Sequence, residues 1–275
     1  MSTPFQKIEV APGITLSEPL AAHWAAIAGS RRPFIKIDPT PSPNLPSTRS
    51  SFGNLPLLPK GFAYPEDAAG NPLFPLATIN FAEVPPLEPF PTSGYLQFFC
   101  TVASDDYGSN YNDLFDTADF RVLYFTPDEV ASPQTHFNFL NPIFEHRRAP
   151  MRTPHALSFQ PAEGYMGPGE IAFDANYAFS EEISDKYPEL ADELERELWR
   201  VFALPGHRLG GYAYFNQEDP RYEFEYDPSL MLLLQIDHNQ GKRTHWNFHG
   251  TAQFLIDPAA LAARDFSAVA FNWDD

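Results

Sequence analysis

The sequence predicts a fold made mainly of strands and shaped loops, with a few helices and an internally repeated core. Of its 275 residues, 43% are hydrophobic, which is enough for a sizeable core. Proline occurs 29 times, roughly twice its usual share, and it disfavours long helices because it lacks an amide donor. Aromatic residues make up 15% of the chain and are mostly Phe. The remaining observation is a repeat.

Two stretches about 150 residues apart share one pattern. The first covers residues 76–80 and then 94–99, and the second covers 233–237 and then 250–255. Each begins as an apolar strand that ends in Ile-Asn or Ile-Asp. A connection and a second strand follow, and the second strand opens with Gly and carries Gln-Phe at matched offsets. An internal repeat of this kind predicts a duplicated structural core.

A helix is expected near the N-terminus, over residues 18–28. Ser17 is a good capping residue, and Pro19 is tolerated in the first turn. The apolar residues of this helix fall on one stripe: Leu20, Trp24 and Ile27.

A short strand and a proline-rich connector are expected next. Ile35 and Ile37 alternate with polar neighbours, which is typical of a strand. Residues 39–61 predict an extended segment that wraps around the protein, with a flexible linker as the alternative. Wrapping is favoured because four apolar residues would be costly to expose: Phe52, Leu55, Leu57 and Leu58.

The middle of the chain predicts three strands and a region of weak pattern. Strands are expected over 73–81, 94–102 and 120–125, with a polar loop at 104–119. Residues 131–182 show little periodicity and scattered Gly and Pro, so we expect short strands and loops there.

A long helix is expected over residues 184–202, where Ser184 is a candidate cap and Pro205-Gly206 a stop signal. Its apolar stripe consists of Leu190, Leu194, Leu198 and Val201. Strands are then predicted over 230–236, 251–256 and 266–271. Between the last two, Asp257-Pro258 predicts the start of a short helix.

The charge and cysteine content limit the classes of partner. The net charge is -18, whereas nucleic-acid binding needs clustered Lys and Arg. The nearest cluster, Arg147, Arg148 and Arg152, is short, so no nucleic-acid partner is predicted. Such acidity serves solubility, and it could also attract a basic partner.

The location predicted from the sequence is the cytoplasm. Cys100 is the single cysteine, so no internal disulfide can form, and this fits a reducing compartment. The N-terminus lacks the apolar core of a signal peptide, and no apolar run approaches the ~18 residues of a membrane helix. No membrane association is predicted, and the oligomeric state is left open.

The densest group of polar residues lies between residues 206 and 221. Gly210-Gly211 would let backbone approach a ligand closely, although the spacing matches neither a phosphate-binding loop nor a dinucleotide fingerprint. The alternative is an internal Asp219–Arg221 pair that shapes its own loop. The candidate ligand-binding residues are His207, Arg208, Tyr212, Gln217, Asp219 and Arg221.

No metal, cofactor or catalytic template is predicted. His245 and His249, with His238, lack the frame of a zinc site. Residues 105–110 lack the spacing of a calcium loop, and Cys100 lies in an apolar strand with no adjacent base or positive charge. Hydrolase motifs such as GxSxG and HExxH are absent from the sequence.

Several motifs in order give the chain a resemblance to the YwqG-like proteins, a bacterial family of unknown function. It covers about residues 50–273 of a single predicted domain that spans residues 1–275, in which residues 1–50 supply an N-terminal helix and a proline-rich wrapping segment. The motifs are residues 51–61, 79–85, 90–99, 106–108, 120–122, 207–212 with 217 and 219–221, 233–237 and 265–267. The resemblance implies an α+β fold, mainly antiparallel sheet, with a duplicated core and a few helices packed on it.

The chain departs from the family pattern at three places. Asn54 replaces the second Gly of the opening motif, and Thr78 stands where Gln is usual. Residues 246–250 replace a usual Trp-Gly-Asp-x-Gly, which puts any family site that uses that Asp in doubt. The resemblance brings no established activity; a link of some relatives to toxin–immunity genes hints at class only.

Two functions are therefore open. The first is a non-enzymatic protein that binds another protein, of immunity or accessory type, since the chain is acidic and rich in aromatic residues. The second is a small-molecule-binding protein or enzyme with a polar cleft between the two repeat halves. There His207 would be an acid or base, and Arg208 or Arg221 an anion clamp.

Overall fold

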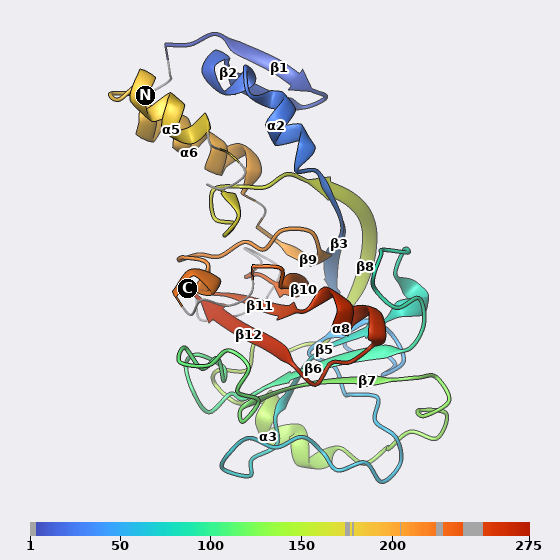
Figure 1. Ribbon diagram of the computed structural model, residues 1–275. Helices are drawn as coiled ribbons and strands as arrows, with labels where there is room; N and C mark the ends of the chain where they lie inside the picture. The colour runs from blue at the N-terminus through green and yellow to red at the C-terminus, as the bar shows by residue number, and fades with distance from the viewer. Residues whose placement is uncertain (1–3, 174–176, 178, 204, 224–227, 239–249) are drawn as a thin grey trace.

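The computed structural model describes residues 4–173, 177, 179–203, 205–223, 228–238 and 250–275. Its main feature is one ten-stranded sheet in which every neighbouring pair is antiparallel (Figure 1). The order across the sheet is β12-β11-β10-β9-β3-β8-β4-β5-β6-β7, and β1 and β2 form a separate pair. The expected α+β class with mainly antiparallel sheet is confirmed.

The elements run along the chain as follows. The strands are β1 (Lys7–Ala11), β2 (Ile14–Ser17), β3 (Arg32–Pro41), β4 (Ser51–Phe52), β5 (Phe74–Asn80), β6 (Tyr95–Cys100), β7 (Phe120–Phe125), β8 (His155–Gly164), β9 (His207–Gly210), β10 (Met231–Ile236), β11 (Thr251–Ile256) and β12 (Val269–Asp274). The helices are α1 (Glu18–Ala21), α2 (Trp24–Gly29), α3 (Asn141–Phe144), α5 (Phe179–Lys186), α6 (Ala191–Phe202), α7 (Pro220–Glu223) and α8 (Pro258–Ala263), with short 3-10 turns at Phe81–Glu83 and Asn138–Leu140.

The centre of the sheet is the long pair of β3 and β8, whereas only short strands and loops were expected over residues 131–182. Ten residues of each strand pair, from Arg32 with Gly164 to Pro41 with His155. Much of β8 is polar or exposed, so it lacks the apolar alternation that predicts a strand. Pro161 pairs with Ile35 on one side. On the other side β4 reaches only the first residues of β8, and proline is tolerated where a strand edge is unpaired.

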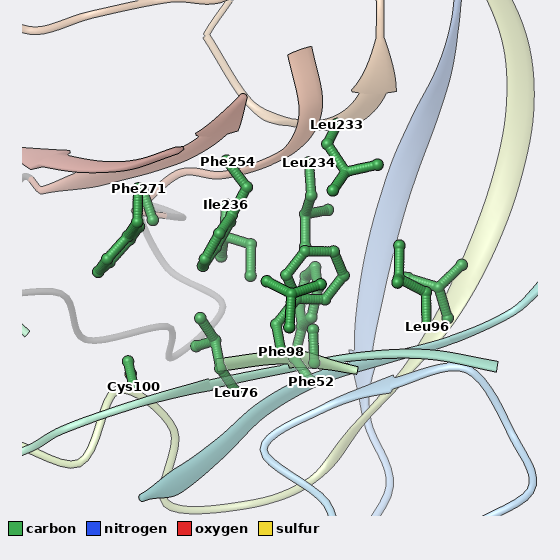
Figure 2. Close-up of a cluster of buried hydrophobic side chains, with 14 of the residues drawn as sticks. Phe52, Leu76, Leu96, Phe98, Cys100, Leu233, Leu234, Ile236, Phe254 and Phe271 are labelled. Carbon is green, nitrogen blue, oxygen red and sulfur yellow. The ribbon is translucent and has the colours of Figure 1, made fainter. Parts of the chain in front are cut away.

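The sheet curls over so that its two ends face each other across the main core. β10, β11 and β12 lie above β5, β6 and β7 (Figure 1). The rings of Phe120 in β7 and Phe271 in β12 have centroids 5.2 Å apart. Figure 2 shows apolar side chains from both groups of strands meeting in this core, including Leu76, Leu234 and Ile236. The outer edge of β12 is covered by a loop, since the Phe271 amide donates to the Leu114 carbonyl.

The strands predicted from the repeat are present, and their pairings follow the same pattern. In β5–β6, Thr78 pairs with Gln97, and a bulge lies between Pro75 and Ala77. In β10–β11, Gln235 pairs with Gln253, and a bulge lies between Leu232 and Leu234. The third strands pair alike: Gln97 faces Leu123 in β7, and Gln253 faces Asn272 in β12.

A second apolar cluster joins β2 and the helices α1, α2, α5 and α6, which lie to one side of the sheet (Figure 1). The prediction of one continuous helix over 18–28 was wrong, because the helix is interrupted between α1 and α2. Ser17 precedes α1 but makes no side-chain cap. Its hydroxyl donates instead to the Glu197 carboxylate, 2.5 Å away.

The predicted helix over 184–202 was also wrong in its extent. The structure has α5 and α6 with a break between them. Pro188 lies in this break, where its missing amide hydrogen disfavours a continuous helix. Ser184 therefore lies inside α5 rather than at a helix start, and α6 begins after Leu190 without a side-chain cap.

Three further local predictions agree wholly or in part with the structure. Asp257 caps α8, accepting hydrogen bonds from the Ala259 and Ala260 amides at 2.8 and 2.9 Å. The last strand, β12, lies three residues beyond the predicted 266–271. In the proline-rich connector, Phe52, Leu57 and Leu58 are buried, whereas Leu55 is exposed.

Candidate functional site

The polar residues that the sequence singled out begin in the strand β9. His207 and Arg208 lie in β9 and are buried. The His207 ring packs against Phe52 with centroids 5.2 Å apart. Its Nδ1 accepts a hydrogen bond from the Asp237 amide at 3.1 Å. His207 therefore packs on β4 and joins β9 by a hydrogen bond to the residue that follows β10.

Arg208 is held by backbone and by an aromatic ring. Its Nη2 donates to the Pro205 carbonyl at 2.8 Å, and its guanidinium carbon lies 4.8 Å from the centre of the Phe34 ring. Burial lowers the pKa of Arg208 to about 10, with Asp237 acting in the opposite direction. The side chain remains charged at neutral pH.

Asp237, which the sequence reasoning did not select, joins three strand ends. Its Oδ2 accepts from the Gly206 amide at 2.6 Å, and its Oδ1 accepts from the Thr251 hydroxyl at 2.9 Å. The bonds connect the starts of β9 and β11 to the end of β10. The Ile-Asp ending of the repeat was the available signal for this role.

Asp219 and Arg221 form a buried network with Glu170. Arg221 donates through Nη2 to Glu170 Oε1 at 2.7 Å and to Asp219 Oδ2 at 2.5 Å, and through Nη1 to the Leu230 carbonyl at 2.7 Å. Asp219 also accepts from the Ile171 amide at 3.1 Å. Burial raises the pKa of Glu170, and Arg221 opposes this shift. The network ties residues 170–171 to the start of β10.

Tyr212 and Gln217 belong to different contacts again. The Tyr212 hydroxyl donates to the Ser30 carbonyl at 2.6 Å, and Arg32 lies over its ring at 4.5 Å. Gln217 is exposed, and its Nε2 donates to the backbone oxygen of Asp275 at 3.2 Å. The six candidates thus divide among at least four separate sets of structural contacts.

Glutamine side chains of the repeat hold the segments that follow β4 and β9. Gln97 accepts from the Leu57 amide and donates to the Leu57 carbonyl, both at 2.7 Å. The Tyr214 amide donates to the Gln235 side chain, and the Gln253 side chain donates to the Tyr214 carbonyl, both at 2.8 Å. The matched Gln-Phe offsets in the sequence were the signal for Gln97 and Gln253, although their partners were not predictable.

The region between the two groups of strands is filled by side chains. Phe98 and Phe254 meet there with ring centroids 4.8 Å apart. A small cavity of about 20 Å³ borders Glu170 and Tyr212, which is room for one or two water molecules.

A wider hollow of about 460 Å³ lies between α5 and α6. Its lining combines buried apolar residues with exposed acidic ones. Those residues are Leu20, Pro168, Phe173, Phe179, Ser180, Glu181, Ile183, Ser184, Asp185, Ala191, Leu194, Glu195 and Leu198. We call this hollow the α5–α6 groove.

In the described part of the chain, His, Cys, Asp and Glu form no group of three or more placed to hold a metal ion. His245 and His249 lie outside the described residues. Burial raises the pKa of the Cys100 thiol. Among the described helices, none has the length and apolar character needed to cross a membrane.

The fold and these contacts define an α+β protein in which most of the candidate polar residues make hydrogen bonds and packing contacts within the fold. Residues 50–274 match the family described as a domain of unknown function, DUF1963. The chain belongs to this family, and the resemblance to YwqG-like proteins is consistent with the match. A search of curated proteins found no match. The matched segment begins after β3, although β3 lies at the centre of the sheet.

Proposed function

We propose that this protein works by binding another protein, in an immunity or accessory role, rather than by catalysis. The observation that carries the proposal is that polar residues between 207 and 221 make hydrogen bonds within the protein itself. Arg221, Asp219 and Tyr212 have hydrogen-bond partners within the frame, and buried polar groups with such partners are typical of structural networks.

The surface chemistry supports the same proposal. The net charge of -18 favours a basic partner through charge steering. Exposed aromatic side chains also occur, and aromatic residues are enriched in protein interfaces. Phe62 is 37% exposed and packs on Phe125, and Phe139 is 44% exposed and packs on Tyr64.

The alternative, an enzyme or small-molecule binder with a polar cleft between the repeat halves, has weaker support. The Phe98–Phe254 contact occupies the centre of that region. His207 and Arg221 also have different surroundings, the first against Phe52 and the second between two carboxylates.

Co-purification tests the proposal. The tagged full-length protein is expressed in its source cells and cross-linked before lysis, and captured proteins are identified by mass spectrometry against a tag-only control. We expect one specific partner that rebinds as purified protein, more weakly as salt rises. Failure to capture any partner above the control would contradict the proposal.

We also propose that the core is duplicated and that the chain forms a single domain. Gly53 after β4 and Gly210 at the end of β9 both have positive φ, at 62° and 69°. Leu57 and Tyr214, each four residues further on, are each held by glutamine side chains. An experimental structure whose best internal superposition did not align Gln97 with Gln253 would contradict duplication.

The proposed location is the cytoplasm, because a single cysteine, which cannot form an internal disulfide, fits a reducing compartment. Fractionation of the source cells tests it, and recovery outside the cytoplasmic fraction would contradict it.

A further inference from the structure

We propose that the α5–α6 groove is the docking site for a basic amphipathic segment of the partner protein. This inference rests on the proposed function, and it adds the surface and the chemistry of the partner. The occupant would place apolar side chains on the floor of the groove and Lys or Arg side chains along its rim. A helix or extended segment laid into an apolar groove is a recurring mode of recognition.

The floor of the groove is apolar because the helices α1, α5 and α6 each contribute buried side chains to it. Leu194 and Leu198 come from one face of α6, Ile183 and Phe179 come from α5, and Leu20 comes from α1. All five belong to the apolar cluster of this helical layer. The volume of about 460 Å³ lies in the range of sites that take ligands.

The rim of the groove is acidic. Glu181 and Asp185 lie one turn apart on α5, and Glu195 lies on α6 beside the floor residue Leu194. All three side chains are exposed. The described lining residues include no Lys or Arg. Carboxylates around an apolar floor complement a segment that carries both apolar and basic residues.

The charge of the surrounding helices strengthens this preference. Residues 179–200 contain eight acidic and three basic side chains. Lys186 and His23 instead border a separate hollow of about 290 Å³ on another side of α5. A basic segment is therefore attracted to the α5–α6 groove, whereas the second hollow has mixed charge.

One wall of the groove, α6, is anchored to the separate β1–β2 pair by hydrogen bonds and an ion pair. Glu197 on α6 accepts hydrogen bonds from the Ser17 amide and hydroxyl at 2.6 and 2.5 Å, and it pairs with Lys7 at 2.7 Å. This contact joins α6 to β1 and β2, while Leu194 and Leu198 remain directed at the groove.

The test uses a fluorescent peptide of about four helical turns, made of Leu at helical spacing with Lys elsewhere. A second peptide has Glu in place of every Lys. Binding to the full-length protein is followed by fluorescence anisotropy at low and high salt. We expect the Leu/Lys peptide to bind and to weaken as salt rises. We expect the Leu/Glu peptide to bind at least about tenfold more weakly, and equal binding of the two peptides would overturn the inference.

Two variants separate the groove from general acidity. Ala191→Trp fills the groove from α6, and Glu181→Lys/Glu195→Lys reverses its rim. Each should weaken binding of the Leu/Lys peptide by about tenfold or more. Glu66→Lys/Asp128→Lys makes the same change in net charge at exposed residues that do not line the groove, and it should leave the affinity within about twofold.

The inference would be overturned if Glu66→Lys/Asp128→Lys weakened peptide binding as much as the rim variant does. It would also be overturned if Ala191→Trp left the affinity for the peptide unchanged. Thermal unfolding shows whether Ala191→Trp is folded. The rim variant changes only exposed side chains and decides the question if it is not.

Partner capture distinguishes the groove from the proposed function. A partner held by the wild type and lost by both groove variants supports the inference. A partner held equally by all of them, or lost only with Phe62→Ala/Phe139→Ala, overturns the groove while the binding function stands. Absence of any captured partner overturns the proposed function, and the peptide results then decide the groove by themselves.

Discussion

The rings of Phe98 and Phe254 meet at the centre of the main core, with centroids 4.8 Å apart and planes inclined by 57°. Each follows a glutamine in its strand, Gln97 in β6 and Gln253 in β11. Because neighbouring residues of a strand point to opposite faces, each Phe enters the shared core while its Gln faces away and binds backbone. Both are among the labelled side chains of Figure 2.

Phe98→Ala should lower the free energy of unfolding by about 3–5 kcal/mol, because the cavity lies in a fully buried site. Urea unfolding measures it. Phe62→Ala, at a residue that is 37% exposed, is the control and should cost less than about 1 kcal/mol. A double-mutant cycle with Phe254→Ala should give a coupling of about 0.5–1.5 kcal/mol. Strict additivity would show that the two rings do not interact.

Gln97→Leu should destabilise the protein by about 2–4 kcal/mol. The change leaves the Leu57 amide and carbonyl without their partners, and each buried unsatisfied group costs about 1–3 kcal/mol. Amide hydrogen exchange should show faster exchange at Leu57. Gln217→Leu, at an exposed residue, is the matched control. A Gln97 variant as stable as this control would rule out the role given to Gln97.

Arg221→Ala should cost about 3–5 kcal/mol, because it leaves the buried carboxylates of Glu170 and Asp219 without their cation. Chemical denaturation measures the loss. Arg196→Ala removes an exposed arginine that lies 3.7 Å from Asp192, and it should cost less than about 1 kcal/mol. Equal effects of the two substitutions would contradict a buried structural network.

Glu197 should make the helical layer sensitive to acid. Burial by itself would raise the pKa of Glu197, but hydrogen bonds from Lys7 and Ser17 outweigh it and hold the pKa below its ordinary value of 4.5. The unfolded state therefore takes up the proton first as pH falls. The stability contributed by Glu197 is present above about pH 4.5 and is lost as pH falls through the folded pKa.

Comparison of the wild type with Glu197→Gln measures this effect. The difference in unfolding free energy between them should be largest near neutral pH and should shrink toward about pH 3. Glu195→Gln, at an exposed residue of the same helix, should show little dependence on pH. A wild-type advantage that stays constant over this range would show that Glu197 is not held ionised by its partners.

The strands of the repeat could be predicted from sequence because each carries its own apolar pattern. β10 is buried at five of six positions, and β11 at all six. β8 could not be predicted in this way, because its position between β3 and β4 allows polar residues and Pro161. The break between α5 and α6 contains Pro188, a local signal against a continuous helix that the predicted range 184–202 did not take into account.

The polar site was predictable only as a set of residues. Local sequence suggested the Asp219–Arg221 pair as an alternative, and the structure contains it. Its third member, Glu170, lies 51 residues from Arg221, and the partner of Tyr212 lies 182 residues away. Spacing along the chain carries no information about such distant contacts.

Residue type and periodicity predicted the strands of the repeat, the shared Gln-Phe pattern and the acidic character, whereas the antiparallel arrangement was implied by the family resemblance. Tertiary structure alone decided that β3 and β8 lie at the centre of the sheet and that the candidate polar residues separate into different contacts. It also decided that an apolar, acid-rimmed groove opens between α5 and α6. The reason is that hydrogen bonding and burial depend on partners brought together by folding, such as Ser17 and Glu197, which are 180 residues apart in the chain.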